Sequence, residues 1–253
     1  MQNLNTEVIA ATPVYAAGAY ILREFLENQK QIQESYPASR LILATSEQDH
    51  KKELIRLLGD HCVKGAVISY DIEKPDYARD RIWNITSGRE AIRKHFLSHE
   101  NAEYLLFLDS DMLFEASIIE KMLSQIYGYD IVFSGYPLKN YGTGLAGCGC
   151  VMLRRAVMEK VKFRCYEFKN GQVIFEDNML EMDAYISGFR IKRGFFAGIK
   201  HYFSAMQFKS QSPQNTTLLQ KVINCSLLRY LLIRLSIMAR FNLPWYLKRL
   251  FFT

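Results

Sequence analysis

The chain of 253 residues holds no Cys-x-x-Cys pair among its cysteines. The five cysteines are an odd number, so a disulfide framework is not expected, and reduced thiols favour a cytoplasmic location. No second Cys/His pair at zinc spacing accompanies Cys148 and Cys150, which are therefore interpreted as small residues of a tight strand. The apolar stretch Val8–Leu22 has no basic residue before it, which argues against a signal peptide.

Acidic residues are absent from Lys209 to Thr253, where seven basic residues occur. Residues 1–208 hold 25 basic and 26 acidic residues, so the body of the protein is close to neutral. A nucleic-acid-binding domain would carry basic residues on its folded body as well, so no nucleic-acid partner is expected. A cationic tail on a neutral body favours contact with a membrane surface instead.

Short apolar runs alternate with amphipathic segments through the first half, which predicts an α/β fold with a mostly parallel sheet flanked by helices. The sequence Ser87-Gly88-Arg89-Glu90 matches a capping box and predicts that a helix begins there and runs to about His99. Pro137–Gly149 is rich in glycine and is interpreted as a mobile loop. Strands are expected at Glu7–Thr12, Leu41–Thr45, Ala66–Tyr70, Tyr104–Leu108, Ile131–Ser134, Val151–Arg154, Arg190–Phe196 and Gly198–Phe203, and further helices at Ala16–Glu34, His50–Leu58, Ser117–Tyr127 and Glu176–Ser187.

Ligands of open α/β sheets bind beyond the carboxyl ends of the strands, so the polar residues that follow each strand are the first candidates for a site. Asp109 and Asp111 come directly after the most apolar strand, YLLFL, and two carboxylates so close together repel one another. A divalent cation placed between them and a phosphate would relieve that repulsion. The other candidates are Thr12–Pro13–Val14–Tyr15, Thr45–Ser46–Glu47 and Ser110.

The segment YLLFLDSDMLF resembles the Asp-x-Asp strand of GT-A-fold nucleotide-sugar glycosyltransferases, and is most similar to glycosyltransferase family 2. Four other segments agree in the order of the family: VIAATPVY, SGREAIRKHF, GCGCVMLRR, and FEDNMLEMDAYISGFRIK with its closing IKHY. The family often has Asn after the Arg of the second segment, where this chain has Glu90. The resemblance covers about residues 7–203. It implies a GT-A (Rossmann-like) catalytic domain over residues 1–208. Nothing in 209–253 is matched, and the composition of this segment predicts a helical, basic and apolar tail.

The resemblance implies that the substrate is a nucleoside-diphosphate sugar and that the cofactor is Mn²⁺ or Mg²⁺. Asp111 would hold the cation, with Asp109 nearer the ribose or base and His201 closing the metal site. The cation would neutralise charge that develops on the diphosphate leaving group. The remaining residues expected to bind the nucleotide are Thr12, Pro13, Tyr15, Glu47, Arg89, in the first turn of its expected helix, and Ser110.

An acceptor hydroxyl must lose a proton as it attacks the sugar, and Glu176 and Asp177 form the second pair of acids. In inverting members of the similar family the Asp of this pair is the base, so Asp177 is the expected base of an inverting reaction. The expected acceptor is a glycan or a glycolipid. Two alternatives remain: a nucleotidyltransferase, which the absence of a basic residue before Arg23 disfavours, and a non-catalytic, membrane-associated nucleotide-sugar-binding protein.

The tail from Thr216 to Phe241 is expected to form one or two helices rich in Leu and Ile. Its arginines recur every five or six residues and would be costly at the centre of a bilayer, which disfavours a membrane span. The preferred interpretation is a monotopic anchor over 216–253, with basic side chains on anionic lipid and with Trp245, Tyr246, Phe251 and Phe252 at the interface. It would place the enzyme at the inner face of a membrane. The alternative is a helix whose apolar face packs on the catalytic domain.

Overall fold

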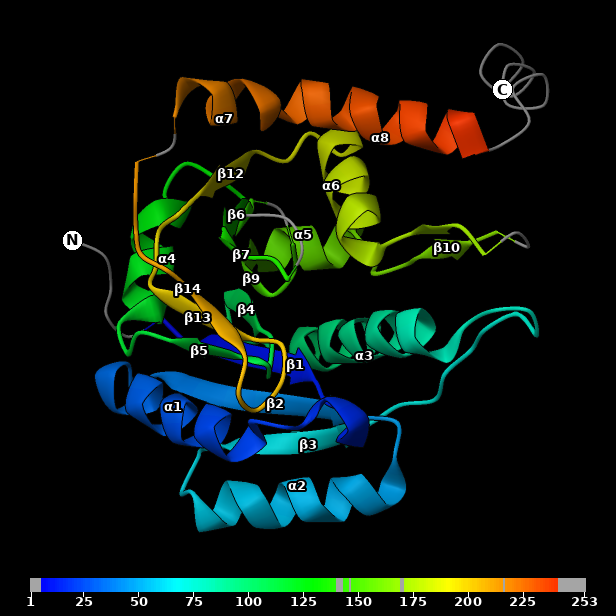
Figure 1. Ribbon diagram of the computed structural model, residues 1–253. Coiled ribbons are helices and arrows are strands. Elements are labelled where there is room, and N and C mark those ends of the chain that lie inside the picture. The colour runs from blue at the N-terminus through cyan, green and yellow to red at the C-terminus, as the bar shows by residue number, and fades with distance from the viewer. Residues whose placement is uncertain (1–5, 140–142, 146, 169–170, 216, 241–253) are drawn as a thin grey trace.

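The computed structural model describes residues 6–139, 143–145, 147–168, 171–215 and 217–240. Its centre is a seven-stranded sheet in the spatial order β12-β6-β9-β4-β1-β2-β3 (Figure 1). Neighbouring strands are parallel, except that β9 is antiparallel to both β4 and β6. The strands are β1 (Val8–Pro13), β2 (Ser39–Thr45), β3 (Gly65–Ser69), β4 (Tyr104–Leu108), β6 (Ile131–Ser134), β9 (Cys150–Arg154) and β12 (Ile191–Gly194).

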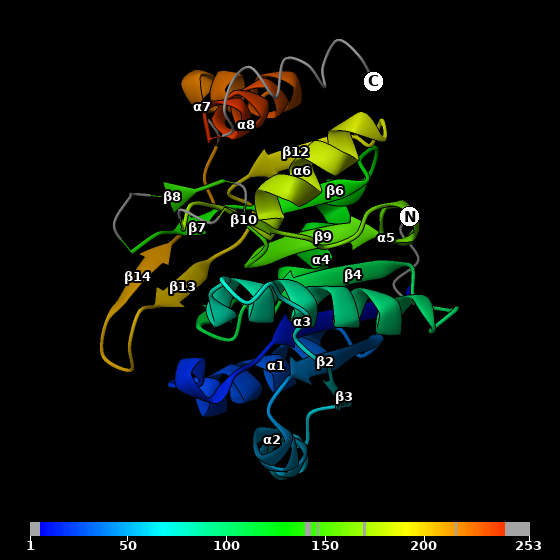
Figure 2. The same ribbon diagram turned by 90° about the vertical axis from the view of Figure 1, so that its right-hand side faces the viewer.

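Helices cover both faces of this sheet (Figure 2). One face packs on α1 (Leu22–Ser35), α2 (Gln48–Asp60) and α4 (Ile118–Ile126), and the other on α3 (Asp80–Leu97), α5 (Arg155–Lys160) and α6 (Glu176–Ile186). Along β4, Leu106 and Leu108 belong to the first core, whereas Leu105 and Phe107 belong to the second. The strand is buried on both faces, which explains its unbroken run of apolar residues.

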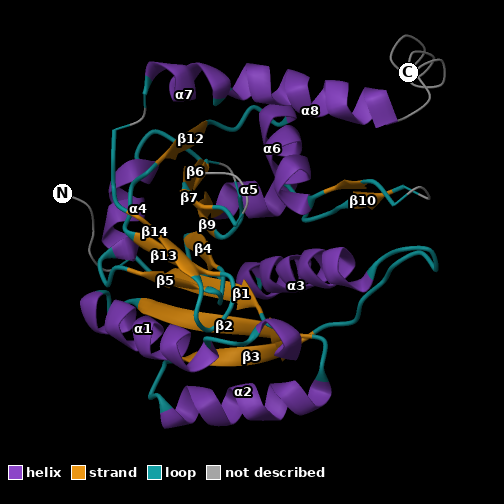
Figure 3. Cartoon of the chain, in the orientation of Figure 1, coloured by secondary structure: helices purple, strands orange, loops and turns teal. Residues whose placement is uncertain are grey.

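Short antiparallel strands complete the fold at the carboxyl ends of the central strands (Figure 3). A three-stranded sheet joins β5 (Met112–Phe114), β13 (Ile199–Tyr202) and β14 (Phe208–Gln211). Two further pairs are β7 (Tyr136–Pro137) with β8 (Thr143–Gly144), and β10 (Tyr166–Glu167) with β11 (Val173–Ile174). Residues 140–142 and 146 of the glycine-rich loop lie outside the described residues.

The predicted start of the third helix is wrong, because α3 begins at Asp80 and Ser87 lies in its interior. Arg89 therefore stands in the third turn and not in the first. Glu167 of β10 supplies the missing cap: its Oε2 accepts hydrogen bonds from the Arg79 backbone N–H at 2.9 Å and from Trp83 Nε1 at 3.2 Å. A carboxylate at a helix N-terminus is favourable, and here it comes from a distant part of the chain.

The first helix also starts later than predicted: a short 3₁₀ turn covers Ala16–Gly18, and α1 begins at Leu22. The other predicted strands and helices are present, with ends displaced by no more than about two residues, the usual uncertainty of helix and strand boundaries. The short strands β5, β7, β8, β10, β11 and β14, and the helix α5, were not predicted from the sequence.

The tail forms α7 (Leu218–Ile223) and α8 (Ser226–Arg240), as predicted, and α8 crosses the end of α6 (Figure 1). Ile233 and Ile237 of α8 pack with Ile174 and Met179, so one face of α8 belongs to the folded body. No helix in the described part of the chain is long and apolar enough to cross a membrane. The predicted interfacial aromatics Trp245, Tyr246, Phe251 and Phe252 lie outside the described residues.

Candidate active site

A cavity of about 630 Å³ opens at the carboxyl ends of β1 and β4. This is the edge at which open α/β sheets bind their ligands. Of the eleven residues predicted for the site, eight line the cavity: Thr12, Pro13, Tyr15, Arg89, Asp109, Ser110, Asp111 and His201.

The remaining lining residues were not predicted for the site, although Tyr202 belongs to the segment IKHY and Leu138 and Lys139 to the glycine-rich loop. Tyr20 donates a hydrogen bond from its hydroxyl to the Tyr202 carbonyl at 2.8 Å, which joins the loop after β1 to β13. Burial and the nearby Asp111 carboxylate raise the pKa of Tyr20 to about 12. Arg81 and Lys139 add two cations to the wall. The full set missed is Ala17, Gly18, Tyr20, Arg81, Ile85, Leu138, Lys139, Tyr202 and Phe203.

Arg89 lies between two of the predicted acids. Its Nη2 is 2.8 Å from Asp109 Oδ1, and its Nη1 is paired with Glu176 Oε1. The Arg89 side chain is 5% exposed and the Glu176 side chain 8%, so this pairing is shielded from water. Arg89 therefore ties α6 to the end of β4, and connects a predicted donor residue with the predicted catalytic pair.

The buried position of these charges perturbs their protonation. Burial raises the pKa of Asp109, and the neighbouring Arg89 cation opposes that rise without cancelling it. For Arg89, burial lowers the pKa but the Asp109 and Glu176 carboxylates outweigh it, so the pKa is raised. The guanidinium thus stays charged and neutralises part of the acid cluster.

Two glycines, Gly149 and Gly88, allow the elements around Asp109 to pack closely. A Cβ at Gly149 would lie 2.9 Å from Asp109 Oδ2 and 2.7 Å from the Met112 side chain, closer than real Cβ contacts allow. Gly149 also accepts the Asp109 backbone N–H at 3.0 Å. On the other side, a Cβ at Gly88 would lie 2.8 Å from Pro13 Cβ, so glycine lets α3 approach the end of β1. The glycine-rich segment is therefore part of the support for Asp109.

Asp111 and His201 come together through strand pairing. The β5–β13 register places His201 opposite Met112, and the Tyr202 N–H bonds the Asp111 carbonyl at 2.8 Å. His201 Nε2 then lies 3.4 Å from Asp111 Oδ2. Burial lowers the pKa of His201, but its hydrogen bonds to Asp111 and to the Pro137 carbonyl raise it by more, so the pKa is raised.

These two residues fit a cation shared with a diphosphate. His201 Nδ1 lies 2.6 Å from the Pro137 carbonyl and donates to it, so Nε2, on the side of Asp111, is the ring nitrogen that could bind a cation once its proton is lost. Asp111 Oδ1 is buried and has no hydrogen-bond partner in the described part of the chain. No group of three or more His, Cys, Asp and Glu side chains that could hold a metal occurs among the described residues. Mn²⁺ or Mg²⁺ would thus take two side chains here, with phosphate and water in its other positions.

Glu176 and Asp177 form the first turn of α6, as predicted. Glu176 faces Arg89, whereas Asp177 is partly exposed and accepts a hydrogen bond from the Asn178 N–H at 2.7 Å. Burial, followed by the Glu176 carboxylate, raises the pKa of Asp177 to about 7. A carboxyl group with this pKa can accept a proton near neutral pH, as a general base requires.

Glu47 does not line the cavity. Its Oε2 accepts the Ala16 N–H at 3.2 Å, so it supports the loop after β1 from outside. Direct contact of Glu47 with a nucleoside stays a prediction.

The sheet order, the Asp-x-Asp turn after β4 and the His-bearing strand beside it define the GT-A class of fold. Over most of its length, the chain is similar in structure to GT-A glycosyltransferases, and the fold class predicted from the sequence is confirmed. In sequence, no protein-family model and no curated protein matches the chain.

Solved structures of similar fold include those of the following two proteins. Residues 1–349 of S. aureus TarS are 12% identical, with a TM-score of 0.51 over 91% of this chain and 72% of that chain. The same fragment in complex with UDP-GlcNAc gives a TM-score of 0.51 at 12% identity over 92% and 66%. The mannosyltransferase PcManGT from Pyrobaculum calidifontis, in complex with GDP-Man and Mn²⁺, is 13% identical, with a TM-score of 0.51 over 74% of this chain and 54% of that chain. This chain thus spans about half of the mannosyltransferase.

Proposed function

We propose that this protein is a metal-dependent glycosyltransferase that moves a sugar from a nucleoside diphosphate to an acceptor hydroxyl with inversion. One observation carries the proposal: Asp111, with an unpartnered buried oxygen, and His201, with its Nε2 directed at that carboxylate, share a cavity with the loop that follows β1. The binding of GDP-Man and Mn²⁺ by a protein of similar fold supports it.

The cavity offers separate surfaces to the parts of such a donor. Thr12, Pro13 and Tyr15 would meet the nucleoside, and Arg81 and Lys139 would attract the diphosphate. When bound at Asp111 and His201, the cation would supply Lewis-acid neutralisation of the diphosphate. Arg89 would hold Asp109 in place, since its two Nη groups are already bonded to carboxylates.

Asp177 would accept the proton of the acceptor hydroxyl as the sugar–oxygen bond forms. Its raised pKa suits this step, and Arg89 links its helix to the donor cavity through Glu176. A turnover assay distinguishes this function from the alternatives. A nucleotidyltransferase would release pyrophosphate from a nucleoside triphosphate, and a binding protein would bind the sugar nucleotide without converting it.

The first prediction concerns Asp111→Asn. Wild-type protein is expected to gain thermal stability with a nucleoside diphosphate and Mn²⁺ together, because a ligand that binds only the folded state stabilises it. Asp111→Asn should lose this joint gain, since the amide is a weaker ligand for a hard cation. A thermal-shift panel of nucleoside diphosphates, with and without Mn²⁺, measures both proteins.

The control is Asp60→Asn, which changes an exposed carboxylate at the end of α2 and should behave like wild type. Retention of the full joint shift by Asp111→Asn would exclude the metal assignment.

We further propose that the tail contacts an anionic membrane surface, near a lipid-linked acceptor. The absence of acids from residue 209 onward suits anionic lipid, and an apolar surface suits its interface. Arg229 departs from the predicted arrangement because it faces α6 rather than lipid. The exposed apolar side chains of the two tail helices are Leu218, Leu219, Val222, Leu227, Leu231, Leu232 and Leu235.

The second prediction follows from that surface. The full chain should sediment with vesicles that contain anionic lipid, and high salt should release it because salt screens the charge attraction. Changing Leu227, Leu231 and Leu235 together to Ser should weaken vesicle binding by at least about tenfold, since each apolar side chain buried in the lipid interface contributes to the binding free energy.

A matched control changes three exposed apolar residues elsewhere, Ile55, Tyr127 and Ile186, to Ser. Equal sedimentation of all three proteins would contradict the membrane contact. Truncation after Ser210 is less informative, because it also removes Arg229 from its partner.

A further inference from the structure

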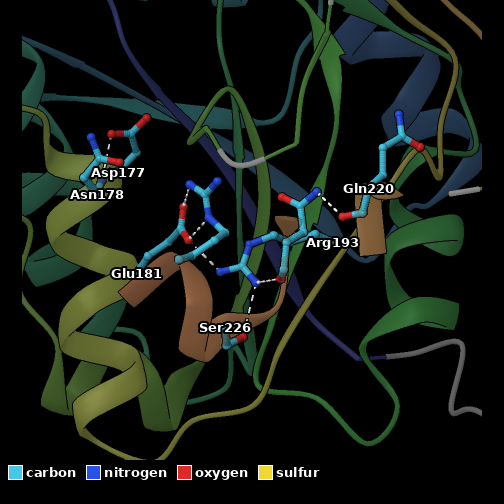
Figure 4. A network of polar contacts seen from close by, with 8 residues as sticks. Asp177, Asn178, Glu181, Arg193, Gln220 and Ser226 are labelled. Carbon is cyan, nitrogen blue, oxygen red and sulfur yellow. Dashed lines mark hydrogen bonds and ion pairs between the residues drawn. The ribbon is translucent and has the colours of Figure 1, made fainter. Parts of the chain in front are cut away.

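Three charged side chains from separate elements meet beneath the tail. Glu181 of α6 accepts a forked pair of hydrogen bonds from Arg229 of α8, at 2.5 Å from Nε and 2.6 Å from Nη2. Arg193 of β12 donates to the same carboxylate from Nη2 at 2.6 Å. Arg193 Nη1 also bonds the Asn224 carbonyl and the Ser226 hydroxyl between the two tail helices, at 3.1 and 3.2 Å. Figure 4 shows Glu181 and Arg193 facing each other, with Ser226 beside Arg193.

Two members of this ion triad are almost completely removed from water, and the third is largely so. The side chains of Glu181, Arg193 and Arg229 are 2%, 3% and 22% exposed. Buried ion pairs add little net stability compared with apolar packing, but their directional hydrogen bonds restrict geometry. Arg193 Nε has no hydrogen-bond partner among the described residues, whereas both of its Nη groups are bonded. The forked Arg229–Glu181 contact is directional, because the planar guanidinium must align with the carboxylate. It therefore constrains the rotation of α6 about its own axis.

Glu181 lies four residues after Asp177, so the two carboxylates occupy the same side of α6 (Figure 4). Fixing Glu181 consequently fixes the direction of Asp177. The fields of these groups also overlap: the Glu181 carboxylate raises the pKa of Asp177, and the Asp177 carboxylate contributes to the raised pKa of Arg229.

We propose that the C-terminal helix α8 belongs to the catalytic apparatus, with Arg229 acting through Glu181 as the positioning residue for Asp177. The role assigned to Asp177 rests on the proposed function, whereas the coupling of α8 to Asp177 rests on the ion triad alone. No cofactor, ligand or additional chain is needed for this coupling.

The groups that face Asp177 come from several elements. Glu176 and Glu181 lie on its own helix, Arg89 reaches it from α3, and Arg229 from α8. The Asp177 carboxylate also contributes to the raised pKa of Tyr136 in β7 and to that of Cys148 before β9. Burial is the largest cause of the raised pKa of Asp177. A helix that merely loosened would admit water, and would lower that pKa toward the ordinary carboxyl range.

Loss of the Arg229 charge should shift the pKa of Asp177 in the opposite direction, upward. Without this cation, the Asp177 anion loses an attractive partner, and Glu181 repels it more strongly. The pKa of Asp177 should therefore rise further in Arg229→Met. Arg229→Lys keeps the charge and should hold the pKa close to the wild-type value.

The test measures the titration of Asp177 directly, in the full chain. Wild type, Arg229→Met and Arg229→Lys are each compared with the same protein carrying Asp177→Asn, and the difference in Tm is followed from pH 5 to 9. The slope of this difference against pH follows the proton bound to Asp177 in the folded state, so the midpoint at which the slope is lost reports the Asp177 pKa. This midpoint should rise by at least about half a pH unit in Arg229→Met. Arg164→Met is the control, because Arg164 donates a similar bidentate pair of hydrogen bonds to Asp183 of the same helix, at 2.8 Å from Nε and 2.7 Å from Nη2. It should not raise the midpoint.

A midpoint that stays unchanged or falls in Arg229→Met overturns the coupling, as does an equal rise in Arg164→Met. Sugar transfer provides the second readout. Arg229→Met should lower kcat by about tenfold or more and leave the KM for donor unchanged, because misplacing a base affects the chemical step and not donor binding. If wild type converts no nucleotide sugar while the midpoint still rises, the proposed function is wrong and the coupling stands.

Discussion

Replacing Arg89 by Met is expected to destabilise the protein by about 3–5 kcal/mol, the usual cost of leaving buried charges without their partner. Asp109 and Glu176 would then face one another with no cation between them, in a region where Glu176 is 8% exposed. The loss should be largest near pH 8 and smaller near pH 5, because burial raises the pKa of Asp109 and protonation of this carboxyl group removes the repulsion. Urea unfolding at the two pH values measures it.

A double-mutant cycle separates charge from packing in this experiment. Adding Glu176→Gln to Arg89→Met removes one of the two carboxylates, and should recover part of the lost stability. Arg56→Met, at an exposed pair with Asp60, should cost no more than about 1 kcal/mol. If Arg89→Met cost no more than Arg56→Met, Arg89 would not be the cation that balances this cluster.

Replacing Asp177 by Asn is expected to reduce sugar transfer by at least about a hundredfold, the usual contribution of a positioned general base. Donor binding, followed by the thermal shift with nucleoside diphosphate and Mn²⁺, should stay as in wild type. The matched control is Asp183→Asn on the same helix, because Asp183 is paired with Arg164 away from the cavity. Unchanged turnover in Asp177→Asn, or a loss of donor binding instead, would assign the base to another residue.

The same residue should govern the dependence of activity on pH. A base must be deprotonated to act, so turnover should fall as the pH drops below about 7, the pKa of Asp177. Stability should change in the opposite direction. Because the folded state raises the pKa of this group, it binds the proton more tightly than the unfolded state, and stability falls as the pH rises through about 7. Asp177→Asn should therefore raise Tm at pH 8 and change it little at pH 4.

The sequence was most informative where local pattern and burial coincide. Tyr104–Leu108 has the predicted bounds, because a strand covered on both faces shows an unbroken apolar run ended by polar residues. The residues that follow β1 and β4 were predicted to form a site, since the carboxyl ends of adjacent parallel strands meet at one edge. Eight of the eleven predicted residues do line one cavity.

Contacts between distant parts of the chain were beyond the reach of such patterns. The start of α3 depends on Glu167, which is 88 residues from Arg79, so the nearer Ser87-x-x-Glu90 pattern was misleading. The pairing of Arg89 with Glu176 spans 87 residues, and that of Arg229 with Glu181 spans 48. Arg229 was expected to face lipid because helical periodicity shows which residues share a face, but not what that face contacts.

The position of β9 in the sheet has a consequence for the order in which the chain can fold. β6 precedes β9 in the sequence, yet β9 lies between β6 and β4 in the sheet. A nascent chain that has not reached residue 150 can assemble β1 to β4, but β6 has no strand to pair with, and β4 presents an open apolar edge. Such an edge pairs readily with other chains. The edge of β4 can thus close only once Cys150–Arg154 is available, and β6 and then β12 can join the sheet after it.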